Sequence, residues 1–191
     1  SEMCIRDSLI ALPFGLAVAV YMSEVANHKI RNLMKPIIEL LSGIPSVVYG
    51  FFGLIVIVPF LQKVFDLPVG ESGLAGSIVL AIMALPTIIT VTEDAMRNCP
   101  RAMREASLAL GASQWQTIYK VVIPYSISGI TSGVVLGIGR AVGETMAVLM
   151  VTGNAAVIPH TILEPLRTIP ATIAAELGEA PAGGAHYEAL F

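Results

Sequence analysis

Residues 105–124 have the sequence EASLALGASQWQTIYKVVIP and connect two strongly apolar parts of the chain. The stretch opens with Glu105-Ala106-Ser107, has Gly111 six residues after the glutamate, and closes with Pro124 after three apolar residues. Glycine adopts backbone conformations that other residues avoid, so Gly111 predicts a sharp bend between two short helices. Proline in the first turn of a helix loses no hydrogen bond, so Pro124 predicts the start of the next helix. The stretch is therefore predicted to be a helical connector between two apolar helices.

The composition indicates a membrane protein. Of the 191 residues, 55% are hydrophobic and 13% are charged, whereas about 25% charged residues is usual in soluble domains. The mean hydropathy is +0.78. The net charge of −3 and the lack of a basic stripe exclude nucleic-acid binding. Cys4 and Cys99 belong to no CxxC pattern or histidine cluster, so the sequence indicates neither a disulfide framework nor a metal site.

The apolar residues are grouped into segments of membrane-spanning length. A helix needs roughly 20 apolar residues to cross a hydrocarbon core of about 30 Å. The second such segment is interrupted by Gly43-Ile44-Pro45-Ser46, where the proline removes a helical hydrogen bond. We therefore predict an all-α polytopic membrane protein with the segments Leu9–Val25, Pro36–Leu61, Gly73–Thr92 and Tyr125–Thr152.

The basic residues predict the orientation of these segments, because cytoplasmic loops are enriched in Lys and Arg. Only Lys63 and Arg167 fall in connections on the side opposite residues 105–124. Segment 93–124 is therefore predicted to be a cytoplasmic loop, and residues 155–185 an extracytoplasmic region with a short helix at Thr168–Leu177. Of the 11 basic residues, those on the cytoplasmic side are Lys29, Arg31, Lys35, Arg97, Arg101, Arg104 and Lys120.

Arg140 and Glu144 are the charged residues inside the fourth segment. An arginine at the bilayer centre costs about 2.5–3.5 kcal/mol on insertion scales, so such residues usually face protein or water. At 100° per residue, both share a helix face with Gly129, Gly133 and Gly137, and their i,i+4 spacing allows them to pair. Two interpretations stay open: a structural ion pair that locks helices together, or a guanidinium that binds an oxyanion in a translocation path.

The interruption at Gly43–Ser46 also has two interpretations. Non-helical backbone at membrane depth is tolerated where it is buried in protein or lines a cavity. Freed amides and the Ser46 hydroxyl are then available to a substrate, but a simple packing kink explains the pattern equally well.

The sequence contains no G-x-x-x-x-G-K-[ST] motif for binding nucleotide phosphates. A nucleotide site, if the function needs one, is therefore expected on a partner protein.

Beyond these patterns, the chain resembles a known family. Residues 105–124 resemble the EAA loop of ABC importer permeases, with Ser107 in place of the second alanine and Val121 in place of the usual isoleucine. Three further runs resemble the PstC-like phosphate importer permeases, and they are GIPSVVYGFFGL at 43–54, GRAVGETMA at 139–147 and RTIPATIA at 167–174, followed by Glu176.

The resemblance implies a MetI-like type I importer bundle, with residues 9–191 as a permease domain that is incomplete at both ends. Residues 1–8 are expected to be a non-native or truncated end. The resemblance places Arg140 and Glu144, with Thr145 and Ser46, in the translocation path. It assigns coupling to the ATPase to Glu105, Ala106, Gly111 and Pro124.

The function implied is ATP-driven, binding-protein-dependent import of inorganic phosphate through a multi-pass protein of the bacterial inner membrane. The implied partners are the lipid bilayer, a PstA-like second permease, a PstB-like ATPase dimer and a PstS-like phosphate-binding protein. ATP and Mg would be bound by the ATPase, and this chain would hold no cofactor and be no enzyme itself. The alternatives are a molybdate or sulfate permease, the PstA-like partner subunit, an intramembrane enzyme using Arg140 and Glu144, or a passive anion channel.

Overall fold

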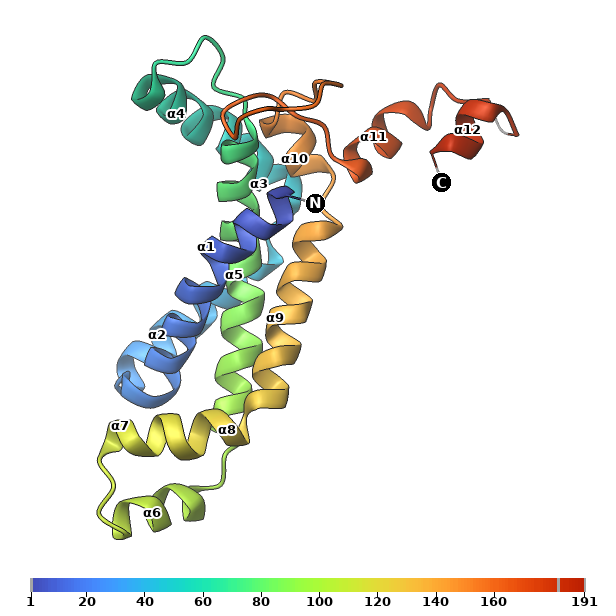
Figure 1. Ribbon diagram of the computed structural model, residues 1–191. Helices are drawn as coiled ribbons and strands as arrows, with labels where there is room; N and C mark the ends of the chain where they lie inside the picture. Colours follow the sequence, from blue (N-terminus) through green and yellow to red (C-terminus); the bar gives the residue numbers. More distant parts are fainter. Residues whose placement is uncertain (1, 182, 191) are drawn as a thin grey trace. The chain divides into compact units, whose positions relative to one another are not determined.

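The computed structural model describes residues 2–181 and 183–190, with side chains from residue 7 onward within these ranges. The predicted all-α class is confirmed: the described residues form helices, π-helical turns and loops, with one isolated bridge between Gly153 and Leu166 (Figure 1). The helices are α1 (Glu2–Val20), α2 (His28–Gly43), α3 (Ser46–Phe52), α4 (Val58–Phe65), α5 (Gly73–Arg97), α6 (Arg101–Ala109), α7 (Gln114–Thr117), α8 (Ile123–Tyr125), α9 (Ile127–Val142), α10 (Met146–Val151), α11 (Ile169–Glu176) and α12 (Ala185–Ala189). The π-helical turns are η1 (Tyr21–Val25), η2 (Gly53–Ile57) and η3 (Ile118–Val122).

Three described helical stretches are long and apolar enough to cross a membrane: Asp7–Val25, Ser46–Phe65 and Gly73–Arg97. A fourth crossing results if Gln114–Tyr125 and Ile127–Val142, which are bent by 70° at their junction, act as one span. The first and third stretches agree with the predicted segments, although α5 continues beyond Thr92 to Arg97.

The predicted second segment, Pro36–Leu61, is wrong at its start. Helix α2 ends at Gly43, and a new helix begins at Ser46. Pro45 between them is extended, with φ −57° and ψ 140°, and a residue that precedes a proline is itself biased away from helix. Residues 36–43 therefore belong to α2, and the spanning stretch starts at Ser46. The predicted interruption at Gly43–Ser46 is confirmed.

The predicted fourth segment, Tyr125–Thr152, is not one continuous helix. It turns at Ser126, whose hydroxyl donates to the Ala95 carbonyl at 3.1 Å, and it breaks again between α9 and α10. At this second break a Glu144 carboxylate oxygen accepts a hydrogen bond from the Ala147 amide at 3.2 Å. The side chain satisfies an amide that would otherwise lack a partner at the start of α10, which favours a new helix there.

The chain divides into two compact units. The first contains Ile44–Ala81 and the chain from Ala141, with the N-terminal stretch up to Asp7. Here α3 and α10 run parallel, because Gly50 lies against Ala147 and Gly53 lies against Val151.

The loop after α10 returns to the start of α5 within the same unit. The Leu166 amide donates to the Thr152 carbonyl at 3.0 Å, and the Leu74 amide donates to the Ile162 carbonyl at 2.8 Å. The short helix predicted at Thr168–Leu177 is confirmed as α11, whose N-cap is Thr168.

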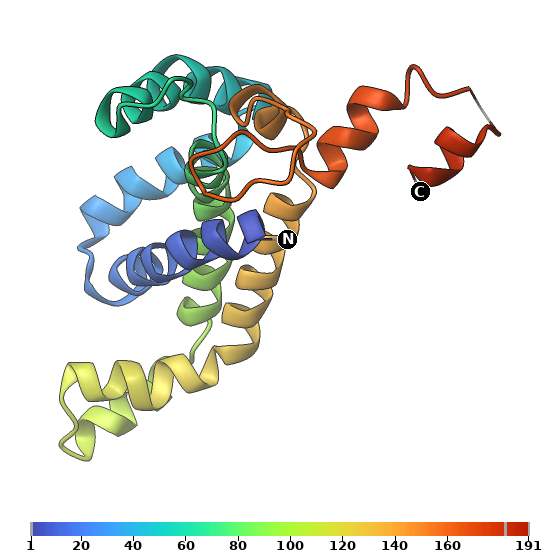
Figure 2. The same cartoon turned by 45° about the horizontal axis from the view of Figure 1, so that its top comes forward.

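The second unit contains Ser8–Gly43 and Ile82–Arg140. Figures 1 and 2 show the C-terminal part of α5 beside α9. The predicted glycine face of α9 forms this contact: a Cβ on Gly129 would lie 2.3 Å from Ala95 Cβ, and one on Gly137 would lie 2.4 Å from Ile88 Cγ1. Without side chains on this face, the two backbones approach closely.

Gly129→Ala is expected to destabilise the folded protein by about 1–3 kcal/mol, because the new methyl group overlaps Ala95, which has no rotamer to relieve the clash. Gly139→Ala in the same helix is the control, because nothing lies within 4 Å of its added methyl group. Thermal unfolding in detergent measures both variants. Equal melting temperatures would show that the close helix contact does not limit stability.

Candidate functional site

Arg140 lies in the last turn of α9, at the end of the glycine face. Its guanidinium donates to Thr87 Oγ1 of α5 and to the Ser42 carbonyl near the end of α2, each at 3.4 Å. Both contacts are at the outer limit for hydrogen bonds, and a guanidinium has five N–H donors. The half-buried guanidinium thus keeps donor capacity that an oxyanion can use.

Glu144 and Thr145 lie in the break between α9 and α10, where Glu144 caps α10 and Thr145 Oγ1 donates to the Gly143 carbonyl at 3.4 Å. The predicted i,i+4 pairing of Arg140 with Glu144 assumed one continuous helix. That geometry is absent, because α9 ends at Val142. The same break explains why the two residues belong to different units.

Ser46 is the first residue of α3. Because α3 and α10 are parallel, Ser46 and Thr145 lie at the same end of this helix pair. Ser46, Glu144 and Thr145 therefore lie at the same end of the α3–α10 pair in the first unit. Arg140 belongs to the second unit, with Thr87 and Ser42.

The connector at 101–125 has the predicted form of short helices joined by a bend. Gly111 has φ +85°, a conformation that L side chains rarely adopt, and it separates α6 from α7. Glu105 and Ala106 are exposed on α6, which has no buried residue. Pro124 lies in the first turn of α8, where the chain enters the bend before α9.

The connector also exposes large apolar side chains. Leu110 is 89% exposed and Trp115 is 64% exposed. Two large exposed apolar side chains within one short connector make this connector a candidate surface for binding a partner.

Ser107, which departs from the family pattern, has a structural role. Its hydroxyl lies 3.0 Å from Thr117 Oγ1 and so links α6 to the end of α7. Ser107→Ala is expected to lower the free energy of unfolding by about 1 kcal/mol, because one partly buried hydrogen bond is lost. The measurement is the melting temperature in detergent, with Ser113→Gly as a comparison that removes the α7 cap instead. A Ser107→Ala melting temperature equal to that of the parent would contradict this role.

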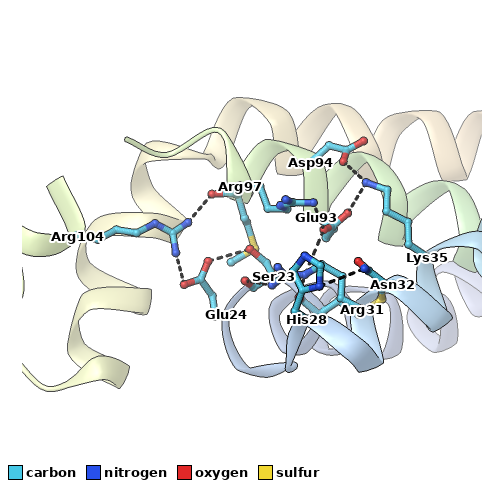
Figure 3. Close-up of polar contacts among 12 residues, drawn as sticks. Ser23, Glu24, His28, Arg31, Asn32, Lys35, Glu93, Asp94, Arg97 and Arg104 are labelled. Carbon is cyan, nitrogen blue, oxygen red and sulfur yellow. Dashed lines mark hydrogen bonds and ion pairs between the residues drawn. The ribbon is translucent and has the colours of Figure 1, made fainter. Parts of the chain in front are cut away.

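An ionic cluster at the C-terminal end of α5 was not predicted (Figure 3). Its centre is Glu93, whose side chain is 1% exposed. The Lys35 amine of α2 donates to Glu93 at 2.9 Å and to Asp94 at 2.6 Å. The members of this Glu93 cluster are Glu24, Arg31, Lys35, Glu93, Asp94, Arg97 and Arg104.

The ammonium group of Lys35 is held in its charged form. Burial alone would lower the pKa of Lys35, but hydrogen bonds from the amine to Asp94 and Glu93 outweigh burial and raise the pKa above its ordinary value of 10.5. The sequence did carry a signal for the cluster, because carboxylates end the third apolar segment on the side where the basic residues gather.

Comparison with known proteins gives three curated relatives of interest. A probable ABC transporter permease protein YqgH of Bacillus subtilis is 44% identical over 98% of this chain. Phosphate transport system permease proteins PstC of Mesorhizobium japonicum and Pasteurella multocida are 39% and 36% identical, each over 90% of this chain. The chain spans 60%, 58% and 60% of the lengths of these three relatives.

Among solved structures, a chain of the MetNI methionine ABC transporter in an inward-facing conformation superposes with a TM-score of 0.73. The superposition covers 99% of this chain and 81% of that chain, at 20% identity, and shows that the fold is MetI-like. The family described as "Binding-protein-dependent transport system inner membrane component" matches residues 11–175. With its apolar helices, its exposed connector and this match over most of its length, the chain belongs to the family of binding-protein-dependent transport system inner membrane components.

Proposed function

We propose that this chain is part of the membrane-spanning permease subunit of an ATP-driven, binding-protein-dependent importer of inorganic phosphate. The choice of phosphate as substrate rests on the similarity, over 90% of the chain, to permeases named for phosphate transport. A different oxyanion as substrate is one outcome of the test below, and a PstA-like subunit of the same importer is the other alternative.

In this proposal Arg140 binds the anion during its passage. A guanidinium matches the geometry of phosphate oxygens and stays charged at any physiological pH. Its two long contacts, to Thr87 and Ser42, orient it without using all its donors. Ser46 and Thr145 are further proposed residues of the translocation path, and the Glu144 carboxylate, which repels an anion, would favour release.

In this proposal the connector at 101–125 transmits the movement driven by ATP hydrolysis to the translocation path. The exposed helix α6, with Glu105 and Ala106, would enter a cleft of a PstB-like ATPase, and the bends at Gly111 and Pro124 would set its angle to α9. ATP and Mg would be held by that ATPase dimer, which agrees with the lack of a phosphate-binding loop motif in this sequence. A PstS-like binding protein would deliver phosphate, and a PstA-like subunit would complete the path in the bacterial inner membrane.

The test is uptake of labelled phosphate into proteoliposomes that hold the full-length permease, its partner permease and the ATPase, with binding protein on the opposite side. We expect uptake that needs ATP and is not reduced by excess molybdate or sulfate. If excess molybdate or sulfate reduces the uptake of labelled phosphate, the competing oxyanion would take the place of phosphate as the proposed substrate. Equal uptake without the ATPase would indicate a channel and refute the proposal.

A further inference from the structure

Helix α6 has few connections to the rest of the second unit. None of its residues is buried, and Ser107 links it to α7 within the same connector. The backbone joins α6 to α5 through residues 98–100. A displacement of α6 therefore reaches α5 through the chain itself, but it needs a side-chain contact to reach α1 or α2.

Arg104 makes that contact. Its guanidinium, 23% exposed, forms an ion pair with the Glu24 carboxylate of η1, which follows α1 directly. The same guanidinium donates to the Met96 carbonyl in the last turn of α5 at 2.8 Å. Carbonyl groups at a helix C-terminus carry partial negative charge, so this position suits a cation. Figure 3 shows Arg104 beside Glu24.

The turn that holds Glu24 is bound from its other side by α2. Arg31 donates to the Met22 carbonyl at 2.8 Å and to the Ser23 carbonyl at 2.7 Å. The Ser23 hydroxyl also donates to Glu24, at 2.8 Å. The junction of α1 and α2 is thus held between Arg31 of α2 and Arg104 of α6.

The burial of Glu24 makes its carboxylate dependent on the ion pair with Arg104. The Glu24 side chain is 7% exposed, and a carboxylate so far from water needs a cation in hydrogen-bonding contact. Because polar groups in such surroundings tolerate little displacement from their partners, η1 is constrained to follow Arg104 when α6 shifts.

We propose that Arg104 is a positioning residue whose ion pair with Glu24 transmits displacement of α6 to the junction of α1 and α2. This inference rests on the proposed function insofar as it takes α6 to be the helix that an ATPase moves. It assigns to Arg104 the coupling of ATP hydrolysis to movement of α1 and α2, and not the binding of either phosphate or ATPase.

The experiment uses the assembled complex in proteoliposomes and reads movement of the junction directly. Asn27 is exposed between η1 and α2, so Asn27→Cys with Cys4→Ser provides a labelling site, and the same protein without Asn27→Cys gives the background from buried Cys99. We expect ATP with vanadate to change the labelling rate of the parent. With Arg104→Gln the change should fall about tenfold, within the roughly 5–150-fold range of coupling between sites, while ATP hydrolysis continues.

Arg97→Gln is the matched control, because it removes an arginine of the same cluster that bonds to Glu93 within its own helix and not to α6. It should leave the labelling response unchanged. The exchange Arg104→Glu with Glu24→Arg should restore part of the response that either single variant loses, because it re-forms the ion pair but gives up the bond from residue 104 to the Met96 carbonyl.

A full labelling response in Arg104→Gln, or no ATP-dependent response in the parent, would overturn the inference. Loss of the ATPase from purified Arg104→Gln complexes would also overturn it, because Arg104 would then serve assembly. Phosphate uptake by the parent vesicles is measured in parallel. If the parent takes up no phosphate but responds to ATP, the proposed substrate fails and the role of Arg104 stands.

Discussion

Arg140→Gln should reduce phosphate uptake about 30-fold or more, because removing a hydrogen-bonded charge from a binding site costs roughly 2–5 kcal/mol. Glutamine keeps much of the length and polarity of arginine but lacks the charge and the fork of donors that match phosphate. Uptake into proteoliposomes measures the loss, and recovery of the ATPase with the purified permease checks assembly. If uptake remains normal, Arg140 is a structural residue that joins α9 to α2 and α5.

Two further variants separate the charge of Arg140 from its orientation. Arg140→Lys keeps a point charge without the fork, so we expect partial uptake with a raised apparent KM for phosphate. Thr87→Val removes the hydroxyl that accepts from Arg140 but leaves the guanidinium in place. Because that contact is 3.4 Å long, Thr87→Val should change uptake only slightly. A loss in Thr87→Val as large as in Arg140→Gln would place Thr87 itself in the path.

Glu93→Gln should produce the largest loss of stability among these variants, about 3–5 kcal/mol. The amide keeps the shape of the side chain, but Lys35 and Arg31 lose the buried negative charge that they share. Breaking one side of a buried ion pair is costly because the partner charges, here on side chains that are only 27% and 18% exposed, lose their compensation.

Asp94→Asn is the matched control for Glu93→Gln. Asp94 contacts the same lysine amine as Glu93, but its side chain is 53% exposed, so we expect a loss of less than about 1 kcal/mol. Cys99 serves as the reporter, because this residue is 3% exposed and its thiol should react with a thiol-specific dye only when the region opens. With Cys4→Ser, the dye follows unfolding at this end of α5. Similar melting temperatures for the two variants would show that burial of Glu93 does not set the strength of the cluster.

The connector at 101–125 and the glycine face of α9 were predictable because their signals are local. Gly111 and Pro124 restrict the backbone at their own positions, and the spacing of Gly129 and Gly137 repeats with the helix. The interruption at Gly43–Ser46 was predictable for the same reason. Each of these features depends on a few consecutive turns of chain.

The remaining features depend on partners far away in the sequence. Lys35 and Glu93 are 58 residues apart, and Glu24 and Arg104 are 80 residues apart, so no pattern along the chain pairs them. The break after Val142 was missed because Gly143 and Glu144 fit an apolar helix with one charged face equally well. The capping bond from the Ala147 amide to Glu144, which favours the break, appears only in the folded chain.

The close approach of α5 and α9 has a consequence for how this protein can evolve. The glycines on the contact face of α9 are matched by particular residues of α5, Gly129 by Ala95 and Gly137 by Ile88. Cores tolerate substitutions that conserve total volume far better than those that add to it. A larger residue at 137 therefore requires a smaller one at 88, and Gly137→Ala should be accepted together with Ile88→Ala, which removes the Cγ1 atom that the new methyl group would overlap. These positions are expected to covary among related sequences, with the size lost on one helix gained on the other.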